Sequence, residues 1–189
     1  MLLLTKAVFA VMVGFLLSAC LGLVLIPLLK RLKVGQRISA FVGESHRKKE
    51  GTPTMGGLIF IIPTVLITLG LWITGKIPYS DNLAIVLIVF CGFAIIGFLD
   101  DFLSIRRHNN EGFTTYQKLF GQIIISTIFF YIYMRNGGQT SWVVGTLHID
   151  LEMGWFYGLF ILFILIGSSN AVNITDGLDG LAGSLSAIA

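Results

Sequence analysis

Long apolar runs alternate with short polar connections along the whole chain of 189 residues. A helix needs about 20 apolar residues to cross the hydrocarbon of a bilayer, with about 17 as the lower limit. The pattern therefore predicts five complete spans and the start of a sixth near Leu178. The fourth run is short, so we expect it to recruit residues 115–118. The uncharged or nearly uncharged runs are 7–29, 57–75, 83–99, 119–134 and 154–172.

The absence of strict alternation between apolar and polar residues in these runs favours helices over a membrane β-barrel. The composition agrees, since 55% of the residues are hydrophobic and 12% are charged, whereas soluble domains carry about 25% charged residues. We expect an all-α, polytopic transmembrane bundle that forms a single integral membrane domain over residues 1–189. A small external hairpin is predicted from strands at 141–144 and 146–150 around Gly145.

Basic residues are distributed unevenly among the connections. Ten of the 13 Lys and Arg residues lie between the first and second runs or between the third and fourth. The positive-inside rule places these two connections in the cytoplasm and the amino terminus outside. Residues 30–54, 100–118 and 168–179 then share the cytoplasmic face, and all the candidate catalytic and phosphate-binding groups collect there. Cys20 and Cys91 lie in apolar runs, so no disulfide is indicated.

The first polar cluster, residues 46–57, contains Lys49 and Thr54 and ends in a glycine pair. It is compatible with a basic membrane anchor followed by a helix start, with Thr52 as N-cap and Pro53 at the first helical position. A sharper interpretation adds a polyphosphate site, in which lysines and free backbone N–H groups meet anionic oxygens, although basic juxtamembrane loops are common. The sequence leaves both interpretations open.

The second cluster is the carboxylate pair Asp100 and Asp101, at the end of an apolar run. Ionisable residues are costly at the edge of the hydrocarbon, which favours a functional role, although Arg106 and Arg107 could simply neutralise them. If the helix continues past Leu99, neighbouring side chains point about 100° apart. The two carboxylates would then face different targets, one a metal ion and the other a substrate proton. Mg²⁺ suits such a pair, because it is bound by one or two carboxylates together with water and phosphates.

In the third cluster Asn170, Asn173, Asp176 and Asp179 recur at every third position. On a helix such residues share one face, so they predict a polar stripe that lines a cavity rather than facing lipid. The spacing does not fit a D-x-D-x-D-G calcium loop. No G-x-x-x-x-G-K-[ST] loop occurs, which excludes a P-loop ATPase.

Residues 51–57 (GTPTMGG), 98–102 (FLDDF) and 170–181 (NAVNITDGLDGL) closely resemble the polyprenyl-phosphate N-acetylhexosamine-1-phosphate transferases, and within them the phospho-N-acetylmuramoyl-pentapeptide branch. The resemblance covers essentially the whole chain. It implies a Mg²⁺-dependent enzyme of the bacterial cytoplasmic membrane that moves phospho-N-acetylmuramoyl-pentapeptide from UDP to undecaprenyl phosphate. The products would be lipid I and UMP, in peptidoglycan synthesis and hence in cell shape and division.

The resemblance also implies roles for individual residues. Asp100 and Asp101 correspond to a catalytic pair that holds the metal, and Asp176 corresponds to another acid of the active site. The implied substrate-binding residues are Lys49, Thr54, Lys118, Asn170, Asn173, Gly177, Leu178 and Asp179. Family members have about ten membrane helices, so residues 1–189 would form the amino-terminal half, inactive alone, with a further metal ligand beyond residue 189. The family also suggests a homodimer, and nothing indicates a nucleic-acid partner.

Two other functions remain open from the sequence. A related transferase that uses UDP-GlcNAc would share the chemistry of Asp100 and Asp101. A proton- or ion-coupled transporter could also keep acids near a membrane interface. A transporter should show inverted repeats with helices broken near the midplane. We find no such repeats in the sequence.

Overall fold

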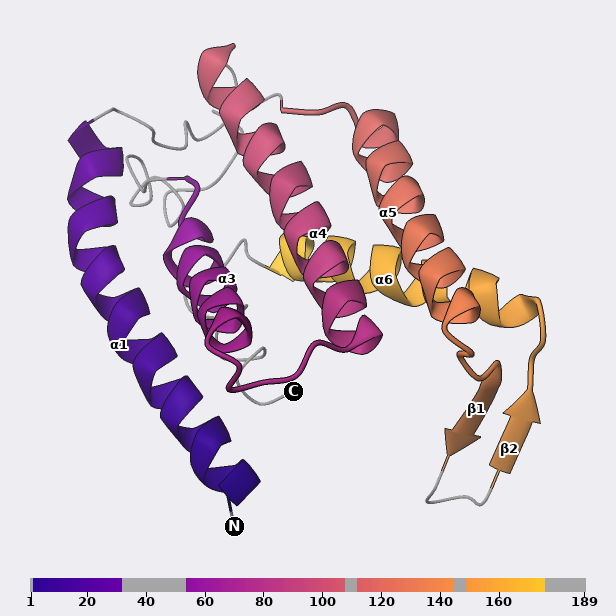
Figure 1. Ribbon diagram of the computed structural model, residues 1–189. Helices are drawn as coiled ribbons and strands as arrows, with labels where there is room; N and C mark the ends of the chain where they lie inside the picture. Colours follow the sequence, from indigo (N-terminus) through magenta and orange to yellow (C-terminus); the bar gives the residue numbers. More distant parts are fainter. Residues whose placement is uncertain (1, 32–53, 108–111, 145–148, 176–189) are drawn as a thin grey trace. The chain divides into compact units, whose positions relative to one another are not determined.

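A computed structural model describes residues 2–31, 54–107, 112–144 and 149–175 (Figure 1). The chain divides into two compact units, Met1–Thr114 and Thr115–Ala189. The elements of the first unit are α1 (Leu2–Arg31), α3 (Leu58–Ile73) and α4 (Asp81–Arg106). The elements of the second unit are α5 (Thr115–Arg135), β1 (Ser141–Val144), β2 (Ile149–Glu152) and α6 (Phe156–Thr175).

Each of the five apolar runs forms a helix, so the predicted membrane-helix fold class is confirmed. Three described helices are long and apolar enough to cross a membrane, namely α1 from Leu4, α4 and α6. Helix α3 has 16 residues, so the number of complete spans stays a prediction. Helix α5 begins at Thr115, which confirms that residues 115–118 extend the fourth run. The start of a sixth span near Leu178 lies outside the described residues.

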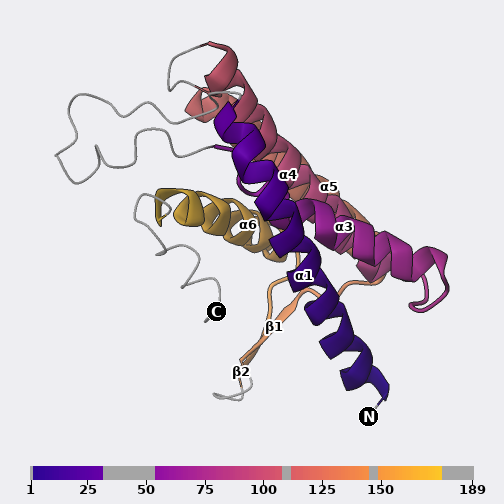
Figure 2. The ribbon, with the colours of Figure 1, turned by 90° about the vertical axis from the view of Figure 1, so that its left-hand side faces the viewer.

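Helix α1 packs against α3 in the first unit (Figure 2). Two glycines of α1 face α3: a Cβ at Gly14 would lie 3.5 Å from Ile67 Cδ1, and a Cβ at Gly22 would lie 3.6 Å from Ile59 Cγ2, both ordinary van der Waals distances. Gly14 faces Ile67 and the later Gly22 faces the earlier Ile59, so the two helices are antiparallel. Packing of small residues against branched ones is typical of helices in membranes, where van der Waals contact replaces the hydrophobic effect.

Helix α3 begins later than the sequence predicted. Its N-cap is Gly57, which provides no side-chain cap, so the prediction of a helix start at Thr52 and Pro53 is wrong, although residues 51–53 themselves lie outside the described residues. The physical reason is Met55, whose φ of 66° is left-handed and incompatible with a helix. Tight turns then lead into the helix, including Leu58 N–H to Met55 O at 3.2 Å.

Short-range hydrogen bonds define both ends of the connection between α3 and α4. Gly75 has a φ of +67°, and Lys76 N–H donates to Leu71 O at 2.9 Å, a Schellman-type helix end that requires a left-handed residue. Ser80 then caps α4, its side chain accepting a hydrogen bond from Leu83 N–H at 3.2 Å. Helix α4 therefore starts at Asp81, and it continues past Leu99 to Arg106.

Helices α5 and α6 pack together in the second unit. Gly158 is buried, and a Cβ there would lie 2.8 Å from the ring of Phe130. One nearby ring pair joins α5 to α6, another joins β1 to α6, and a third lies within α5. Their centroid distances are 5.9 Å for Phe129–Tyr133, 6.0 Å for Tyr133–Tyr157 and 5.3 Å for Trp142–Phe160.

The predicted hairpin exists, but its second strand was placed too early. Strand β1 matches the prediction, whereas β2 covers Ile149–Glu152 instead of 146–150. Ser141 pairs with Glu152 and Val144 with Ile149, and Met153 N–H donates to Thr140 O at 3.0 Å. Residues 145–148 lie between the strands and outside the described residues. A single glycine cannot reverse an antiparallel pair, because even the shortest common hairpin loops have two residues.

Candidate functional site

Asp100 and Asp101 lie in the last turns of α4, because this helix runs on beyond the apolar segment. Both side chains are half-buried, and each carboxylate accepts a backbone N–H from a different part of the chain. Asp101 Oδ2 accepts from Met55 at 2.8 Å, and Asp100 Oδ1 accepts from Phe113 at 2.7 Å. Helix α4 thus continues past Leu99 and its two carboxylates meet different backbone donors, whereas the metal ion and the substrate proton stay predictions.

The contact between Asp101 and Met55 brings the segment that precedes α3 onto the carboxylate end of α4. The left-handed Met55 turns its N–H toward the acid. The preceding residue, Thr54, has a buried hydroxyl with no hydrogen-bond partner within the described part of the chain. Buried polar atoms are normally satisfied. An unsatisfied hydroxyl one residue from a carboxylate contact is therefore a candidate for ligand binding.

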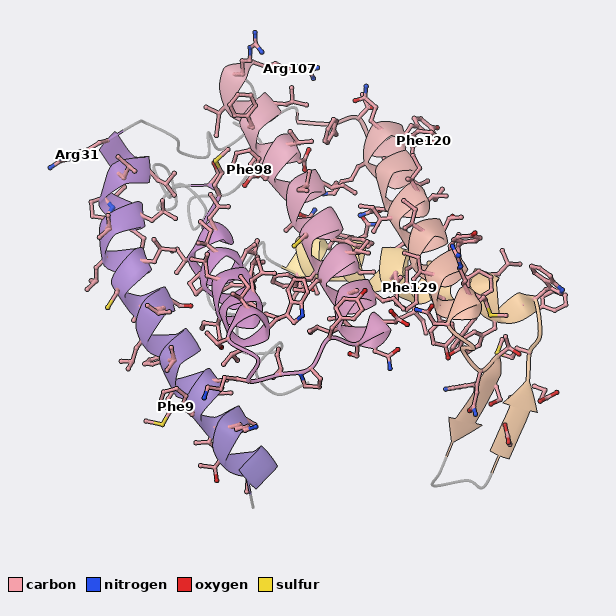
Figure 3. The ribbon with its side chains drawn as sticks, in the orientation of Figure 1. Phe9, Arg31, Phe98, Arg107, Phe120 and Phe129 are labelled. Atoms are coloured by element: carbon pink, nitrogen blue, oxygen red, sulfur yellow. The ribbon has the colours of Figure 1, made fainter. Side chains whose placement is uncertain are left out.

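The chain after α4 returns to the same helix end. Arg107 Nη1 donates to Gly112 O at 3.1 Å, and the next N–H, that of Phe113, reaches Asp100. A Cβ at Gly112 would collide with the Asp100 carboxylate and would lie 2.7 Å from its backbone oxygen. Figure 3 shows Arg107 at the end of α4, with Phe98 further back on the same helix. Arg107 and Asp100 therefore bind the two ends of one peptide group, that between Gly112 and Phe113.

The two adjacent carboxylates fit a magnesium ion by the chemistry of their donors. Mg²⁺ binds hard oxygen ligands and commonly takes one or two carboxylates, with water and substrate phosphates completing the octahedron. Among the described residues no three His, Cys, Asp or Glu side chains come together, so a complete protein cage for a metal is not formed there. Asp100 and Asp101 match the sparse ligand set that magnesium accepts.

A second polar group joins α5 to α6. Asn170 Nδ2 donates to Gln122 Oε1 at 2.9 Å and to Ile166 O at 2.9 Å. Gln122 Nε2 donates to Ser169 Oγ at 3.3 Å, and only 1% of Gln122 is exposed. The amide nitrogen of Asn170 is thus engaged in helix packing, whereas Asn173 is exposed on α6. The predicted polar stripe stays a prediction, because Asp176 and Asp179 lie outside the described residues.

Several predicted site residues lie elsewhere. Lys118 is in the first turn of α5, in the second unit, where it is half-buried and makes contacts of its own. Five predicted residues fall outside the described residues, so their roles stay predictions: Lys49, Asp176, Gly177, Leu178 and Asp179.

Sequence reasoning missed several residues that shape these contacts. Gly112 and Phe113 act through their backbone, and no residue type or spacing signals such a role. Met55 belongs to the motif at residues 51–57, but its left-handed conformation accompanies the tertiary contact with Asp101 and is not visible in the sequence. Gln122 could have been found, because it is an uncharged polar residue inside the apolar run 119–134, where it needs a partner.

The described residues define a helical membrane protein with paired carboxylates at a helix end. Comparison with known proteins identifies the family of the chain. The sequence model of glycosyl transferase family 4 matches residues 83–189, more than half of the chain, so the chain belongs to this family. The signature 1 of phospho-N-acetylmuramoyl-pentapeptide-transferases matches residues 49–61, the segment that Met55 joins to Asp101.

Similar curated proteins carry the same description. The chain is 44% identical over 183 residues to a phospho-N-acetylmuramoyl-pentapeptide-transferase of Geobacillus kaustophilus, covering 96% of this chain and 56% of the relative. It is 42% identical over 182 residues to that of Bacillus subtilis, with the same coverage. The transferase of Oceanobacillus iheyensis is 42% identical over 188 residues, covering 98% of this chain and 57% of the relative. The chain thus spans a little over half the length of these relatives.

Proposed function

We propose that this chain is part of an enzyme that transfers phospho-N-acetylmuramoyl-pentapeptide from UDP to undecaprenyl phosphate. The products are UMP and lipid I, the membrane-bound precursor of peptidoglycan. The observation that carries the proposal is the 2.8 Å hydrogen bond from Met55 N–H to Asp101 Oδ2. It joins the segment that matches the transferase signature to the carboxylate pair to which the resemblance assigns catalysis, and both lie within one unit.

The reaction exchanges one phosphoanhydride bond for another. An oxygen of the lipid phosphate attacks the phosphorus that bears the sugar, and the bond from this phosphorus to the bridging oxygen of UMP breaks. The leaving UMP keeps the electron pair on that oxygen. A phosphate monoester has its second pKa near 6, so at pH 7 the attacking oxygen is mostly deprotonated already. Direct attack needs little help from a base.

The main difficulty of this reaction is the mutual repulsion of two anions. A bound Mg²⁺ would neutralise the phosphate oxygens and stabilise the charge that develops on them. In the proposed site Asp100 and Asp101 hold this ion, joined by a further ligand beyond residue 189. The backbone donors at Phe113 and Met55 fix one oxygen of each carboxylate. Thr54, whose buried hydroxyl has no hydrogen-bond partner among the residues that the structure describes, contacts the nucleotide sugar.

The remaining predicted residues complete the proposed site. Lys49 and Lys118 contact phosphate groups, and Asn170 and Asn173 face the nucleotide sugar. Asp176 contributes another acid, and Gly177, Leu178 and Asp179 receive the uridine. We place the enzyme in the bacterial cytoplasmic membrane as a homodimer, with its amino terminus outside and the site facing the cytoplasm, where the soluble nucleotide meets the lipid phosphate.

The choice of nucleotide-sugar substrate tests the proposal. Full-length protein in detergent with undecaprenyl phosphate and Mg²⁺ should release UMP from UDP-N-acetylmuramoyl-pentapeptide, and a phosphatase-coupled assay or chromatography measures this release. UDP-GlcNAc in place of that donor should give little UMP. UMP release from UDP-GlcNAc alone would assign the chain to the related GlcNAc-1-phosphate transferases. Release from neither donor would refute the proposal.

A further inference from the structure

The peptide group between Gly112 and Phe113 lies between two charged side chains. Its carbonyl oxygen accepts a hydrogen bond from Arg107 Nη1 at 3.1 Å, and its N–H donates to Asp100 Oδ1 at 2.7 Å. A peptide unit carries a dipole of about 3.5 D. Here the partially negative oxygen faces the guanidinium and the partially positive N–H faces the carboxylate. Both contacts are charge-assisted, so each holds the peptide in the orientation that the other requires.

Glycine is required at position 112 for this arrangement. A Cβ there would collide with the Asp100 carboxylate and would lie 2.7 Å from the Asp100 backbone oxygen. The backbone oxygen belongs to helix α4 and cannot move away without disturbing that helix. By contrast, a Cβ at Gly97, one turn earlier on α4, would meet nothing within 4 Å. The close approach is therefore specific to the peptide that touches Asp100.

The contact fixes the rotation of the carboxylate. The terminal torsion of an aspartate side chain is broad and roughly two-fold, so a carboxylate on a helix end does not orient itself. The Phe113 N–H holds Oδ1 in place, which also sets the direction in which Oδ2 points. Arg107 has no need to touch a substrate to influence this direction, because it holds the same peptide from its other side.

We propose that Arg107 is a positioning residue, which aligns the Asp100 carboxylate for metal binding through the Gly112–Phe113 peptide. This inference rests on the proposed function, in which Asp100 holds the magnesium ion. Groups that orient a metal ligand typically change metal affinity or activity about 10- to 100-fold when they are removed. An arginine that only stabilises the helix end or anchors it at the membrane would have no special position, so Arg106 would serve equally well. A positioning role belongs to Arg107 alone.

Four variants of the full-length protein test the role of Arg107 in activity: Arg107→Gln, Arg107→Lys, Gly112→Ala and the matched control Arg106→Gln. We expect Arg107→Gln to lower kcat about 10-fold and to raise the Mg²⁺ concentration for half-maximal rate by a similar factor. The KM for the nucleotide sugar should change less than about twofold, because Arg107 contacts no substrate. Arg107→Lys keeps a cationic donor and should restore most of the rate, and Arg106→Gln should resemble the wild type.

Gly112→Ala should reproduce the loss, whereas Gly97→Ala should not. Thermal unfolding in detergent accompanies each assay. A form of Arg107→Gln that unfolds well below the wild type, or one that matches Arg106→Gln in rate and Mg²⁺ dependence, would overturn the inference.

A spectroscopic measurement tests the contact independently of activity. In full-length protein labelled with ¹⁵N-phenylalanine, Phe113→Leu assigns the Phe113 amide signal. This signal should move in Arg107→Gln and in Asp100→Asn, but not in Arg106→Gln. An unchanged signal in Arg107→Gln overturns the contact. The wild-type protein could also release no UMP while the Phe113 signal behaves as expected. That result would overturn the proposed function, and with it the catalytic part of the inference, but not the contact.

Discussion

Asp101 Oδ2 accepts a hydrogen bond from the backbone N–H of Met55 at 2.8 Å, although 46 positions separate the two residues. This bond joins the end of α4 to the segment before α3. It also explains why a methionine adopts a left-handed conformation, with φ at 66°. The carboxylate thus has a structural contact as well as a proposed role in metal binding.

The backbone conformation of Met55 predicts opposite effects of two substitutions. A left-handed conformation costs an ordinary residue about 1–2 kcal/mol and a glycine almost nothing. Met55→Gly should therefore leave the free energy of unfolding unchanged or raise it slightly, whereas Met55→Val should lower it by about 1–3 kcal/mol. Thermal unfolding in detergent measures both, with Met12→Val on the exposed face of α1 as the control. Equal stability of Met55→Val and wild type would contradict the left-handed conformation.

Gly158 predicts a packing effect between α5 and α6. A Cβ at this position would lie 2.8 Å from the Phe130 ring, and overpacking of this kind costs about 1–3 kcal/mol. Gly158→Ala should lower the unfolding temperature, and Phe130→Leu in the same protein should recover part of the loss. Gly167→Ala is the matched control, because a Cβ there meets nothing within 4 Å. A loss in Gly167→Ala equal to that in Gly158→Ala would argue against the close contact.

Gln122 predicts a measurable contribution from polar helix pairing. Gln122→Leu removes the acceptor of Asn170 Nδ2 and the donor to Ser169 Oγ. Hydrogen bonds between membrane helices contribute about 0.6 kcal/mol each, and up to about 1.7 kcal/mol, so the total loss should be about 1–3 kcal/mol. Thr127→Val is the control on the same helix, since the Thr127 hydroxyl donates to Ile123 O within α5 itself, at 2.8 Å. Steric-trap or denaturant unfolding in micelles measures the difference, and equal stability of the two variants would contradict the account.

Removal of divalent metal tests the proposed role of the carboxylate pair. A chelator should abolish UMP release by the full-length enzyme, and added Mg²⁺ should restore it, because without the ion two anionic substrates repel each other. Unfolding temperature before and after chelation separates a catalytic ion from a structural one. Full activity in the presence of excess chelator would contradict a metal-dependent mechanism.

The apolar pattern of the chain predicted the helices well, because the length of a membrane helix is fixed by the bilayer and is visible as a run of apolar residues. It was less successful at helix ends. The start of α3 was predicted at Thr52 from capping residues, but the helix begins at Leu58, since the tertiary contact of Met55 overrides the local capping preference. The second hairpin strand was misplaced for a related reason, because its register depends on pairing with β1.

The candidate site shows the same division between local pattern and tertiary contact. Asp100 and Asp101 were recognisable because acids at the end of an apolar run are costly and unusual. The peptide at Gly112–Phe113 was not recognisable, because it acts through backbone atoms that every residue possesses. The spacing of Asn170 predicted a polar helix face, but it did not predict that the amide nitrogen donates to Gln122 Oε1 of α5. Sequence spacing does not show which side of a helix faces a neighbour.

The central claim is that Asp100 and Asp101 carry the transfer chemistry. Its most direct test compares full-length Asp100→Asn and Asp101→Asn with the wild type in UMP release from UDP-N-acetylmuramoyl-pentapeptide across a Mg²⁺ titration, with Asp150→Asn in the hairpin as the control. We expect both site variants to lose at least about 100-fold in kcat, as removal of a directly acting electrostatic group does, while the control keeps wild-type turnover. Retained turnover and unchanged Mg²⁺ dependence in both site variants would contradict the assignment.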